Sequence, residues 1–324
     1  MASDLPRVAR SPRFLQLHRH DDAALQRELE DGLLAAAASI APKFLYDPLG
    51  SRLFDAITEL PEYYPTRTEA AIFLRHAREM ACAVHRGATL VDLGAGNCCK
   101  AGRLFGVLEP RRYVAVDISV EFLHNALQAL QREHPQVEML GIGMDFSARL
   151  SLPDECGDGP RVVFYPGSSI GNFSPDQALR FLREAREAAR DGDLLIGVDL
   201  LKSREQLVRA YDDELGVTAA FNLNLLNHVN TLLGADFRVR DWRHVAEFEA
   251  AASRIEMHLE ARRALVVRWP GGERRFEAGE RIHTENSYKY EPQRFAGLLG
   301  EAGFGGIRAW TDPRGWFAVF SASA

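Results

Sequence analysis

Residues 88–96 read ATLVDLGAG and residues 112–118 read RYVAVDI, so one apolar run leads into a glycine turn and the next ends in an acid. Short runs rich in Val, Ile and Leu are typical of buried strands, and a helical stretch separates these two. Asp117 follows Gly96 by 21 positions. A strand, a glycine turn, a helix and a second strand with an acid at this spacing are typical of a nucleotide-binding βαβ unit.

Three further apolar runs continue the pattern toward the C-terminus, with helical stretches between them. They are residues 136–143 (QVEMLGIG), 161–167 (RVVFYPG) and 193–200 (DLLIGVDL). Strands that alternate with helices build parallel sheets, which are buried on both faces. The sequence therefore predicts an α/β fold with a Rossmann-like sheet.

The pattern changes after residue 201. A long helix containing FNLNLLNHVNTLL (residues 221–233) is followed by runs that alternate polar and apolar residues, the first of them FRVRDW (237–242). The turn Pro270-Gly271-Gly272 predicts an antiparallel hairpin. We expect a helix over residues 292–302 and two last strands, 306–312 and 315–322, that rejoin the first sheet. The region between is then an insertion with a sheet of its own.

The N-terminal part has weaker signals. The first 20 residues are basic and irregular in pattern, whereas Leu25, Leu29, Leu33 and Ala37 recur every four residues, as on one face of a helix that ends near Pro42. Residues 46–68 read as packed loop and short helix. We predict two interleaved domains: a domain with the Rossmann-like sheet, residues 69–203 and 289–324, and a smaller α+β substrate domain, residues 1–68 and 204–288.

Composition excludes several classes of protein. The formal net charge is −6, from 39 Lys and Arg against 45 Asp and Glu, which argues against a nucleic-acid partner. No apolar run approaches the roughly 18 residues of a membrane span, and the start MASDLPRVARSPRF lacks the apolar core of a signal peptide. We expect a cytoplasmic monomer with a small-molecule substrate and no membrane partner.

No metal site is predicted. His18 and His20 flank Arg19 without a carboxylate at a helical interval, and they read as a solvated loop. The cysteines are too few for a disulfide framework and lack the paired spacing of a zinc site, so we expect free thiols: Cys82, Cys98, Cys99 and Cys156.

The glycine turn also indicates which nucleotide binds. Gly94 and Gly96 allow a ligand to approach the backbone closely, and Asp117 can accept hydrogen bonds from both ribose hydroxyls. A dinucleotide fingerprint would place Gly or Ala where this chain has Cys99, and no ATP-binding P-loop motif occurs. An adenosyl cofactor without phosphate remains, and S-adenosylmethionine is the common one.

Other residues near this edge of the sheet keep two interpretations each. Lys100 can meet the methionine carboxylate of the cofactor or be a solvated first-turn lysine. Asp145 and Phe146 can hold and stack on the adenine or be a polar loop end. We interpret Asp199 as structural, and Cys98 and Cys99 as small packing residues at a helix start.

Five blocks resemble the bacterial histidine N-alpha-methyltransferases of ergothioneine biosynthesis. They are YDPLGSRLFDAITELPEYYPTRTE (46–69), FYPGSSIGNF (164–173), YDDELGVTAAFNLNLL (211–226), SRIEMHLEAR (253–262) and IHTENSYKY (282–290). The family trimethylates the alpha-amine of L-histidine with S-adenosylmethionine, which yields hercynine. The resemblance implies that activity here, and it assigns the cofactor to Gly94, Lys100, Asp117, Asp145 and Phe146.

The same resemblance implies the substrate site. Asn172 and Tyr211 would bind the histidine carboxylate, Glu285 and Ser287 the imidazole, and Tyr63 would contribute to the imidazole pocket. Tyr46 would lie near the amine and Met257 would form an apolar wall. By sequence alone Asn172 also fits a helix N-cap or Asx-turn, Tyr211 and Met257 fit plain core residues, and the pair on the strand fits a solvent-facing edge.

Methyl transfer to a neutral amine demands alignment more than a strong base, so we expect positioning residues and no essential catalytic histidine. Tyr46 and Tyr63 are the candidates for a roomy amine pocket that tolerates a cation. The runner-up function is the same chemistry on another amino acid or amine, because the loop GNCCK and residues Asn286 and Tyr288 depart from the family pattern. A protein methyltransferase, a cofactor-binding module without chemistry and a nicotinamide dehydrogenase fit less well.

Overall fold

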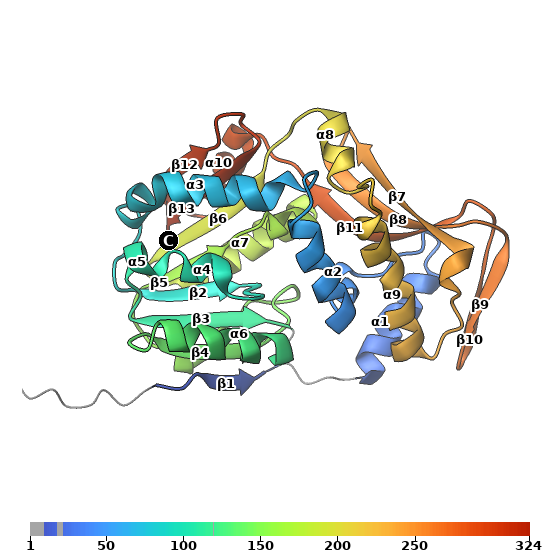
Figure 1. Ribbon diagram of the computed structural model, residues 1–324, viewed down its shortest axis with the longest axis horizontal. Helices are drawn as coiled ribbons and strands as arrows, with labels where there is room; N and C mark the ends of the chain where they lie inside the picture. Colours follow the sequence, from blue (N-terminus) through green and yellow to red (C-terminus); the bar gives the residue numbers. More distant parts are fainter. Residues whose placement is uncertain (1–9, 18–21, 119) are drawn as a thin grey trace, which may run out of the picture.

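The computed structural model describes residues 10–17, 22–118 and 120–324, and His18 and His20 lie outside these ranges. A large sheet covered by helices forms one side of the molecule (Figure 1). A smaller antiparallel sheet forms the other side, together with helices α1 (Asp22–Leu34), α2 (Pro48–Thr58) and α9 (Val217–Leu233) (Figure 1). Among the described helices, none is both long enough and apolar enough to cross a bilayer.

The large sheet has eight strands in the order β1-β4-β3-β2-β5-β6-β13-β12. The pairs from β1 to β6 are parallel, whereas β13 runs antiparallel to both β6 and β12. The strands are β1 (Arg13–Gln16), β2 (Thr89–Leu93), β3 (Arg112–Asp117), β4 (Glu138–Gly143), β5 (Arg161–Tyr165), β6 (Asp193–Asp199), β12 (Gly305–Thr311) and β13 (Phe317–Ser323). The α/β prediction and the return of the last two strands to this sheet are confirmed.

Helices cover both faces of this sheet, as the two-sided burial of its strands requires. In β2, Leu90 faces one apolar core and its neighbour Val91 faces the other, because side chains alternate along a strand. The helices are α3 (Tyr64–Ala81), α4 (Cys99–Gly102), α5 (Phe105–Leu108) and α6 (Val120–Glu133) on the Leu90 side, and α7 (Pro175–Ala189) and α10 (Pro292–Glu301) on the Val91 side.

The smaller sheet has three antiparallel strands in the order β11-β8-β7, and a separate hairpin pairs β9 with β10. The hairpin confirms the turn predicted at Pro270-Gly271-Gly272. The strands are β7 (Trp242–Glu249), β8 (Arg254–Ala261), β9 (Leu265–Trp269), β10 (Gly272–Phe276) and β11 (Arg281–Tyr288). One core joins them to α1 (Asp22–Leu34), η1 (Pro42–Leu45), α2 (Pro48–Thr58), α8 (Arg204–Arg209) and α9 (Val217–Leu233).

Two predictions near the N-terminus are wrong. Residues 13–16 are not irregular, because they form β1, which pairs in parallel with β4 at the sheet edge. The first helix ends at Leu34 instead of near Pro42. The chain turns back there: the Ser39 amide donates to the Gly32 carbonyl, and the Ile40 amide donates to His283 of β11. A Cβ at Gly32 would lie 2.3 Å from the Ser39 oxygen, so this turn needs glycine.

The expected strand over residues 237–242 is also wrong for most of its length. Residues Val239–Asp241 form a 3-10 helix, and β7 begins at Trp242. The Asn230 side chain accepts from the Phe237 amide and donates to its carbonyl, each across 2.9 Å. The main chain of Phe237 is therefore bonded to the end of α9 and is unavailable for a strand ladder.

Candidate active site

One pocket lies where the two sheets meet, and it encloses about 570 Å³ including its open mouth. All of the residues that the sequence assigned to the substrate line it, although they come from six separate segments of the chain. They are Tyr46, Tyr63, Asn172, Tyr211, Met257, Glu285 and Ser287. Phe54, Phe221 and Asp199 also line the pocket.

Strand β11 supplies two buried polar groups to the pocket. Glu285 and Ser287 are two positions apart, so their side chains leave the strand on the same face. Glu285 is 7% exposed and Ser287 is 5% exposed. The solvent-facing interpretation of this pair is therefore wrong, and both side chains are available only to a ligand in the pocket or to their buried neighbours.

Asn172 lies beside β11, at the end of η3 (Ser169–Asn172), and its side-chain amide donates to Glu285 Oε1 across 3.1 Å. It does not cap the following helix. Ser174 is the N-cap of α7 and forms a capping box with Gln177. The N-cap interpretation of Asn172 is therefore wrong, because Ser174 satisfies the first turn of that helix.

Gly171 allows η3 to lie directly against β11. A Cβ at this position would come within 2.9 Å of the Tyr288 carbonyl oxygen and 3.5 Å of Ser287 Oγ. A backbone oxygen cannot move aside as a flexible side chain can. The glycine is therefore needed for the close approach that brings Asn172 to Glu285.

Burial raises the pKa of Glu285 to about 7, although the Lys289 charge and the hydrogen bond from Asn172 both act to lower it. An imidazole ring has a pKa of about 6.5 in water. The carboxyl group and an imidazole bound beside it would therefore exchange a proton near neutral pH. Such a pair suits recognition of a ring that carries one N–H and one bare nitrogen.

Tyr211 lies between α8 and α9, and its hydroxyl is 2.7 Å from Ser287 Oγ. Its main chain is held by the partly buried ring of His244, whose Nε2 lies 2.8 Å from the Tyr211 carbonyl oxygen. Burial lowers the pKa of His244, so this ring is neutral and donates from Nε2, while Nδ1 accepts from Asn222 across 2.9 Å. Tyr211 is therefore held at its main chain by His244 and at its hydroxyl by Ser287.

Aromatic rings form the opposite wall. Tyr46 packs edge-on against Phe54 and Phe221 with ring centroids 5.6 Å apart in both pairs, and Tyr63 packs against Tyr211 at 6.3 Å. Burial raises the pKa of Tyr46 and Tyr63 well above the ordinary value, so both stay neutral phenols. They can present ring faces and hydroxyl dipoles to a cation, but they do not supply a tyrosinate base.

A buried charged cluster adjoins the pocket, and we define it as Asp199, Lys202, Lys289 and Tyr64, of which Asp199 also lines the pocket. Asp199 Oδ1 lies 2.6 Å from Lys202 and Oδ2 lies 2.8 Å from Lys289. The Tyr64 hydroxyl donates to both carboxylate oxygens. Burial alone would raise the pKa of Asp199, but the two lysines outweigh it and the pKa is lowered. Sequence reasoning treated Asp199 as structural and did not single out Lys289.

The predicted cofactor residues gather at the C-terminal edge of β2, β3 and β4. Gly94 and Gly96 have φ values of 70° and 52°, in the left-handed region that favours glycine. Asp117 accepts from the Gly96 amide across 2.9 Å. A Cβ at Gly94 would lie 3.9 Å from the Phe146 ring, so these two residues border the same space.

Asp145 directly precedes Phe146 and contacts η1, which packs in the core of the smaller sheet. It accepts from the Ser147 hydroxyl across 2.5 Å and from Lys43 of η1 across 3.3 Å. Burial would raise the pKa of Asp145, but Ser147 and Lys43 outweigh it, so the group is ionised at neutral pH. An ionised carboxylate at this place can accept hydrogen bonds from an adenine amino group.

Lys100 links this edge to the substrate pocket. Its Nζ lies 2.7 Å from Glu69 Oε2, and Glu69 Oε1 accepts from the Gly167 amide across 2.7 Å. Gly167 lines the pocket, whereas none of the predicted cofactor residues does: Gly94, Gly96, Lys100, Asp117, Asp145 and Phe146. The two candidate sites are therefore neighbours that meet near Lys100 and Gly167.

The adjacent cysteines of the glycine loop differ from each other. Cys98 is fully buried, and burial raises the pKa of its thiol to about 12, so it is a packing residue. Cys99 is exposed, and its backbone amide donates to the Asn97 side-chain oxygen across 3.1 Å. The packing interpretation is therefore wrong for Cys99.

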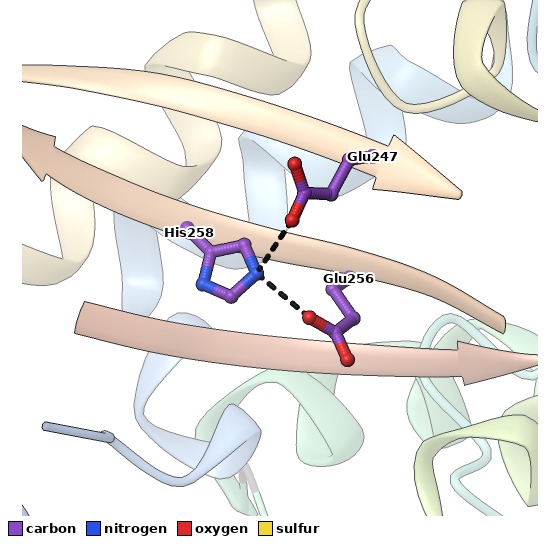
Figure 2. A group of neighbouring side chains, drawn as sticks. All are labelled: Glu247, Glu256 and His258. Atoms are coloured by element: carbon purple, nitrogen blue, oxygen red, sulfur yellow. Dashed lines mark hydrogen bonds and ion pairs between the residues drawn. The ribbon is translucent and has the colours of Figure 1, made fainter. Parts of the chain in front are cut away.

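A second cluster of ionisable groups lies on the smaller sheet, where Glu247, Glu256 and His258 point toward one another from β7 and β8 (Figure 2). His258 Nε2 is 3.0 Å from Glu256 and 4.0 Å from Glu247. Arg254 pairs with Glu256 and Arg281 pairs with Glu247. Because guanidinium groups already neutralise both carboxylates, this cluster is an ion-pair network, and we assign no metal to it.

Comparisons with known proteins identify the family of this chain. The family model described as histidine-specific methyltransferase, SAM-dependent, matches residues 25–324. The chain is 42% identical over 303 residues to a histidine N-alpha-methyltransferase of Mycolicibacterium smegmatis, covering 91% of this chain and 94% of that protein.

Two further relatives extend the comparison. A histidine N-alpha-methyltransferase of Mycobacterium tuberculosis is 42% identical over 313 residues, covering 93% of this chain and 96% of that protein. Ergothioneine biosynthesis protein 1 of Neurospora crassa is 32% identical over 278 residues, covering 82% of this chain and 31% of that protein.

Proposed function

This chain belongs to the family of histidine-specific, S-adenosylmethionine-dependent methyltransferases, and on that premise we propose that it trimethylates the alpha-amine of L-histidine to hercynine in ergothioneine biosynthesis. One observation supports this proposal above the others. Residues suited to an imidazole and to a carboxylate converge on a single buried pocket that adjoins the glycine loop through Lys100 and Gly167.

The residues at the edge of the large sheet fit an adenosyl cofactor. Left-handed Gly94 and Gly96 leave the backbone open, and Phe146 borders the same space. When bound, S-adenosylmethionine supplies an electrophilic methyl group on its sulfonium and leaves as S-adenosylhomocysteine. We propose that Asp117 accepts hydrogen bonds from the ribose hydroxyls and that Asp145 accepts one from the adenine amino group. Lys100, which is paired with Glu69, would bind the methionine carboxylate.

Four side chains would hold the histidine. Glu285 and Ser287 face the two ring nitrogens, and their shared strand face lets them act on one ligand. The Asn172 amide has two N–H groups, so it can donate one to Glu285 and the other to the substrate carboxylate. Tyr211 donates to the same carboxylate, and Met257 closes the wall beside the ring.

The reaction requires the protein to align the substrate amine with the methyl group of the cofactor. An alpha-amine has a pKa of about 8 in peptides and a somewhat higher one in a free amino acid, so a fraction of the substrate is a neutral nucleophile near neutral pH without a dedicated base. Tyr46 and Tyr63 stay protonated, and they would surround the nitrogen with ring faces and hydroxyl oxygens as it gains methyl groups and a fixed charge. The chain's contribution is then to orient the amine and exclude water.

We also propose that the pocket lies between two domains, residues 69–203 with 289–324 and residues 1–68 with 204–288, except that β1 (Arg13–Gln16) pairs with β4 in the sheet of the first domain. Residues from both parts line it: Asn172 from the first, and Tyr63, Tyr211 and Glu285 from the second. A substrate held by both parts is enclosed on several sides, which suits a small molecule and not a protein side chain.

A substrate panel with the Glu285→Ala variant tests this function. We expect L-histidine to be the preferred amine of the native protein over tryptophan, phenylalanine and tyrosine. The variant should raise the KM for histidine strongly and reduce that preference, because a polar pocket rejects ligands that leave it unpaired. Glu277→Ala is the matched control, since that side chain is 67% exposed and lies between β10 and β11, outside the pocket lining.

The outcomes separate the candidates. Unchanged histidine kinetics in Glu285→Ala would remove the assignment of the imidazole site. Efficient methylation of a different amine, with little activity on histidine, would favour the same chemistry on another substrate.

A further inference from the structure

A fully buried ammonium group lies directly behind the two hydroxyls of the pocket. Lys289 follows β11, and its side chain is 0% exposed. Its Nζ lies 2.9 Å from the Tyr211 hydroxyl, 2.8 Å from Ser287 Oγ and 2.8 Å from Asp199 Oδ2. Lys289 itself does not line the pocket, so it acts on a ligand only through the groups that it contacts.

The number of donors and acceptors limits the hydrogen bonds that the Tyr211 and Ser287 hydroxyls can form. A lysine ammonium has three N–H donors and no acceptor, and here each donor has one of the three oxygens as its partner. Neither hydroxyl can donate toward Lys289. The hydroxyls of Tyr211 and Ser287 are 2.7 Å apart, so one of them donates to the other. A single hydroxyl hydrogen is left to face the ligand.

The chemistry of the ligand determines whether this hydrogen comes from Tyr211 or from Ser287. A carboxylate only accepts hydrogen bonds, so a carboxylate beside Tyr211 selects the arrangement in which Tyr211 donates outward and Ser287 donates to Tyr211. Ser287 then keeps a free lone pair, which suits a ring N–H. A donor that already accepts from an ammonium group is polarised and binds an anion more strongly.

We propose that Lys289 is a positioning residue that orients the Tyr211 and Ser287 hydroxyls and provides, through Tyr211, the positive charge that the substrate carboxylate requires. This inference rests on the proposed function, because it takes an amino acid as the ligand. It also explains how a carboxylate can be bound where the side chains that contact it, Asn172 and Tyr211, are neutral. The charge lies one hydrogen bond behind them.

A double-mutant cycle on the full chain tests the proposal. The variants are Lys289→Met, Tyr211→Phe and both together, and the measurements are KM and kcat for L-histidine and the Kd for S-adenosylhomocysteine. Each single variant should raise the KM for histidine by about tenfold or more, as expected for a lost charge-assisted hydrogen bond. The double variant should be little worse than the worse single variant, because both changes remove the same interaction.

Lys202→Met provides the matched control cycle with Tyr211→Phe. Lys202 is 3% exposed and pairs with the same Asp199, but it donates to Tyr64 and to the Leu200 carbonyl instead of to the pocket hydroxyls. Its effect on KM should multiply with that of Tyr211→Phe. Lys289→Gln, which keeps two N–H donors without the charge, replaces Lys289→Met if the latter does not fold.

The results are decisive in each direction. Coupling between Lys289 and Tyr211, with an unchanged Kd for S-adenosylhomocysteine, supports the proposal. Independent effects of the two substitutions, or a loss in kcat and cofactor binding with an unchanged KM, overturn it while the proposed function stands. A native protein that neither binds nor methylates histidine overturns the proposed function and this inference with it.

Discussion

The side-chain amide of Asn172 donates a hydrogen bond to Glu285 across 3.1 Å, although the two residues are 113 positions apart. Asn172 follows a strand of the large sheet, and Glu285 belongs to the edge strand of the small one. This contact joins the two halves of the molecule at the wall of the pocket. On our assignment, it also places one amide between the two polar ends of an amino-acid substrate.

Asn172→Ala should weaken histidine binding. The change removes the donor to Glu285 and, on our assignment, a donor to the substrate carboxylate, so we expect the KM for histidine to rise by about tenfold or more. Steady-state kinetics at saturating cofactor provide the measurement. Ser174→Ala is the control: it removes the N-cap of α7 and should lower the free energy of unfolding by about 1 kcal/mol. A rise in KM of the same size in Ser174→Ala would show that loop stability, not contact, is responsible.

The affinity for histidine should be highest near neutral pH. Glu285, with a pKa of about 7, and the ligand imidazole, at about 6.5, share one proton in the complex. Above pH 7 a proton must be taken up for binding, and below pH 6.5 one must be released, so the affinity falls on both sides. Calorimetric titration of L-histidine into the complex with S-adenosylhomocysteine, over a range of pH, measures this profile.

Glu285→Gln is the test variant for that pH profile. Glutamine does not titrate, so the fall in affinity on the alkaline side should disappear while the fall on the acid side, which belongs to the ligand ring, remains. A variant with the same two-sided profile as the native protein would show that another group carries the shared proton.

Gly171→Ala should damage the substrate site more than the fold. The new Cβ would meet the Tyr288 carbonyl oxygen at 2.9 Å and push η3 away from β11. We expect a loss of about 1 to 3 kcal/mol in the free energy of unfolding, together with a raised KM for histidine. Gly297→Ala in α10 is the control, because a Cβ there meets nothing within 4 Å. Thermal unfolding and kinetics on both variants distinguish the two effects, and an unchanged KM in Gly171→Ala would contradict the packing argument.

Asp117→Ala should act on the cofactor. The variant loses the hydrogen bond that Asp117 accepts from the Gly96 amide and, on our assignment, the acceptor for the ribose hydroxyls. We expect the Kd for S-adenosylhomocysteine to rise by about tenfold or more, since hydrogen bonds to an ionised group are lost. Calorimetry gives the Kd directly. Glu109→Ala, a surface carboxylate paired with Arg86, should leave the Kd unchanged. Equal affinities in Asp117→Ala and the native protein would reject the ribose assignment.

The large sheet could be predicted from sequence because its strands are buried on both faces. Such strands read as continuous runs of Val, Ile and Leu, and β2, β5 and β6 are buried along their whole length. The short edge strand β1 lacks this signal, since only its two middle residues, Phe14 and Leu15, are partly buried. Its pairing with β4 depends on a partner more than 100 positions away.

The polar side chains that line the pocket could be predicted because they lie in long sequence blocks that resemble the family. The buried charges that hold those side chains in place could not be predicted in this way. Lys289 lies at the end of one such block, where a lysine ordinarily reads as solvent-exposed. Its partner Asp199 ends β6, some 90 positions earlier, and no local pattern connects the two. Burial of a charge is a property of the assembled fold, and it became visible only when both strand ends were placed.

The most direct test of the whole account is a single incubation of the purified protein with S-adenosylmethionine and L-histidine, followed by mass spectrometry with fragmentation. The account predicts species with one, two and three added methyl groups, all on the alpha-nitrogen, and accumulation of the trimethyl product. Methyl groups on the imidazole ring, or no methylated histidine from a protein that still binds S-adenosylhomocysteine, would contradict it.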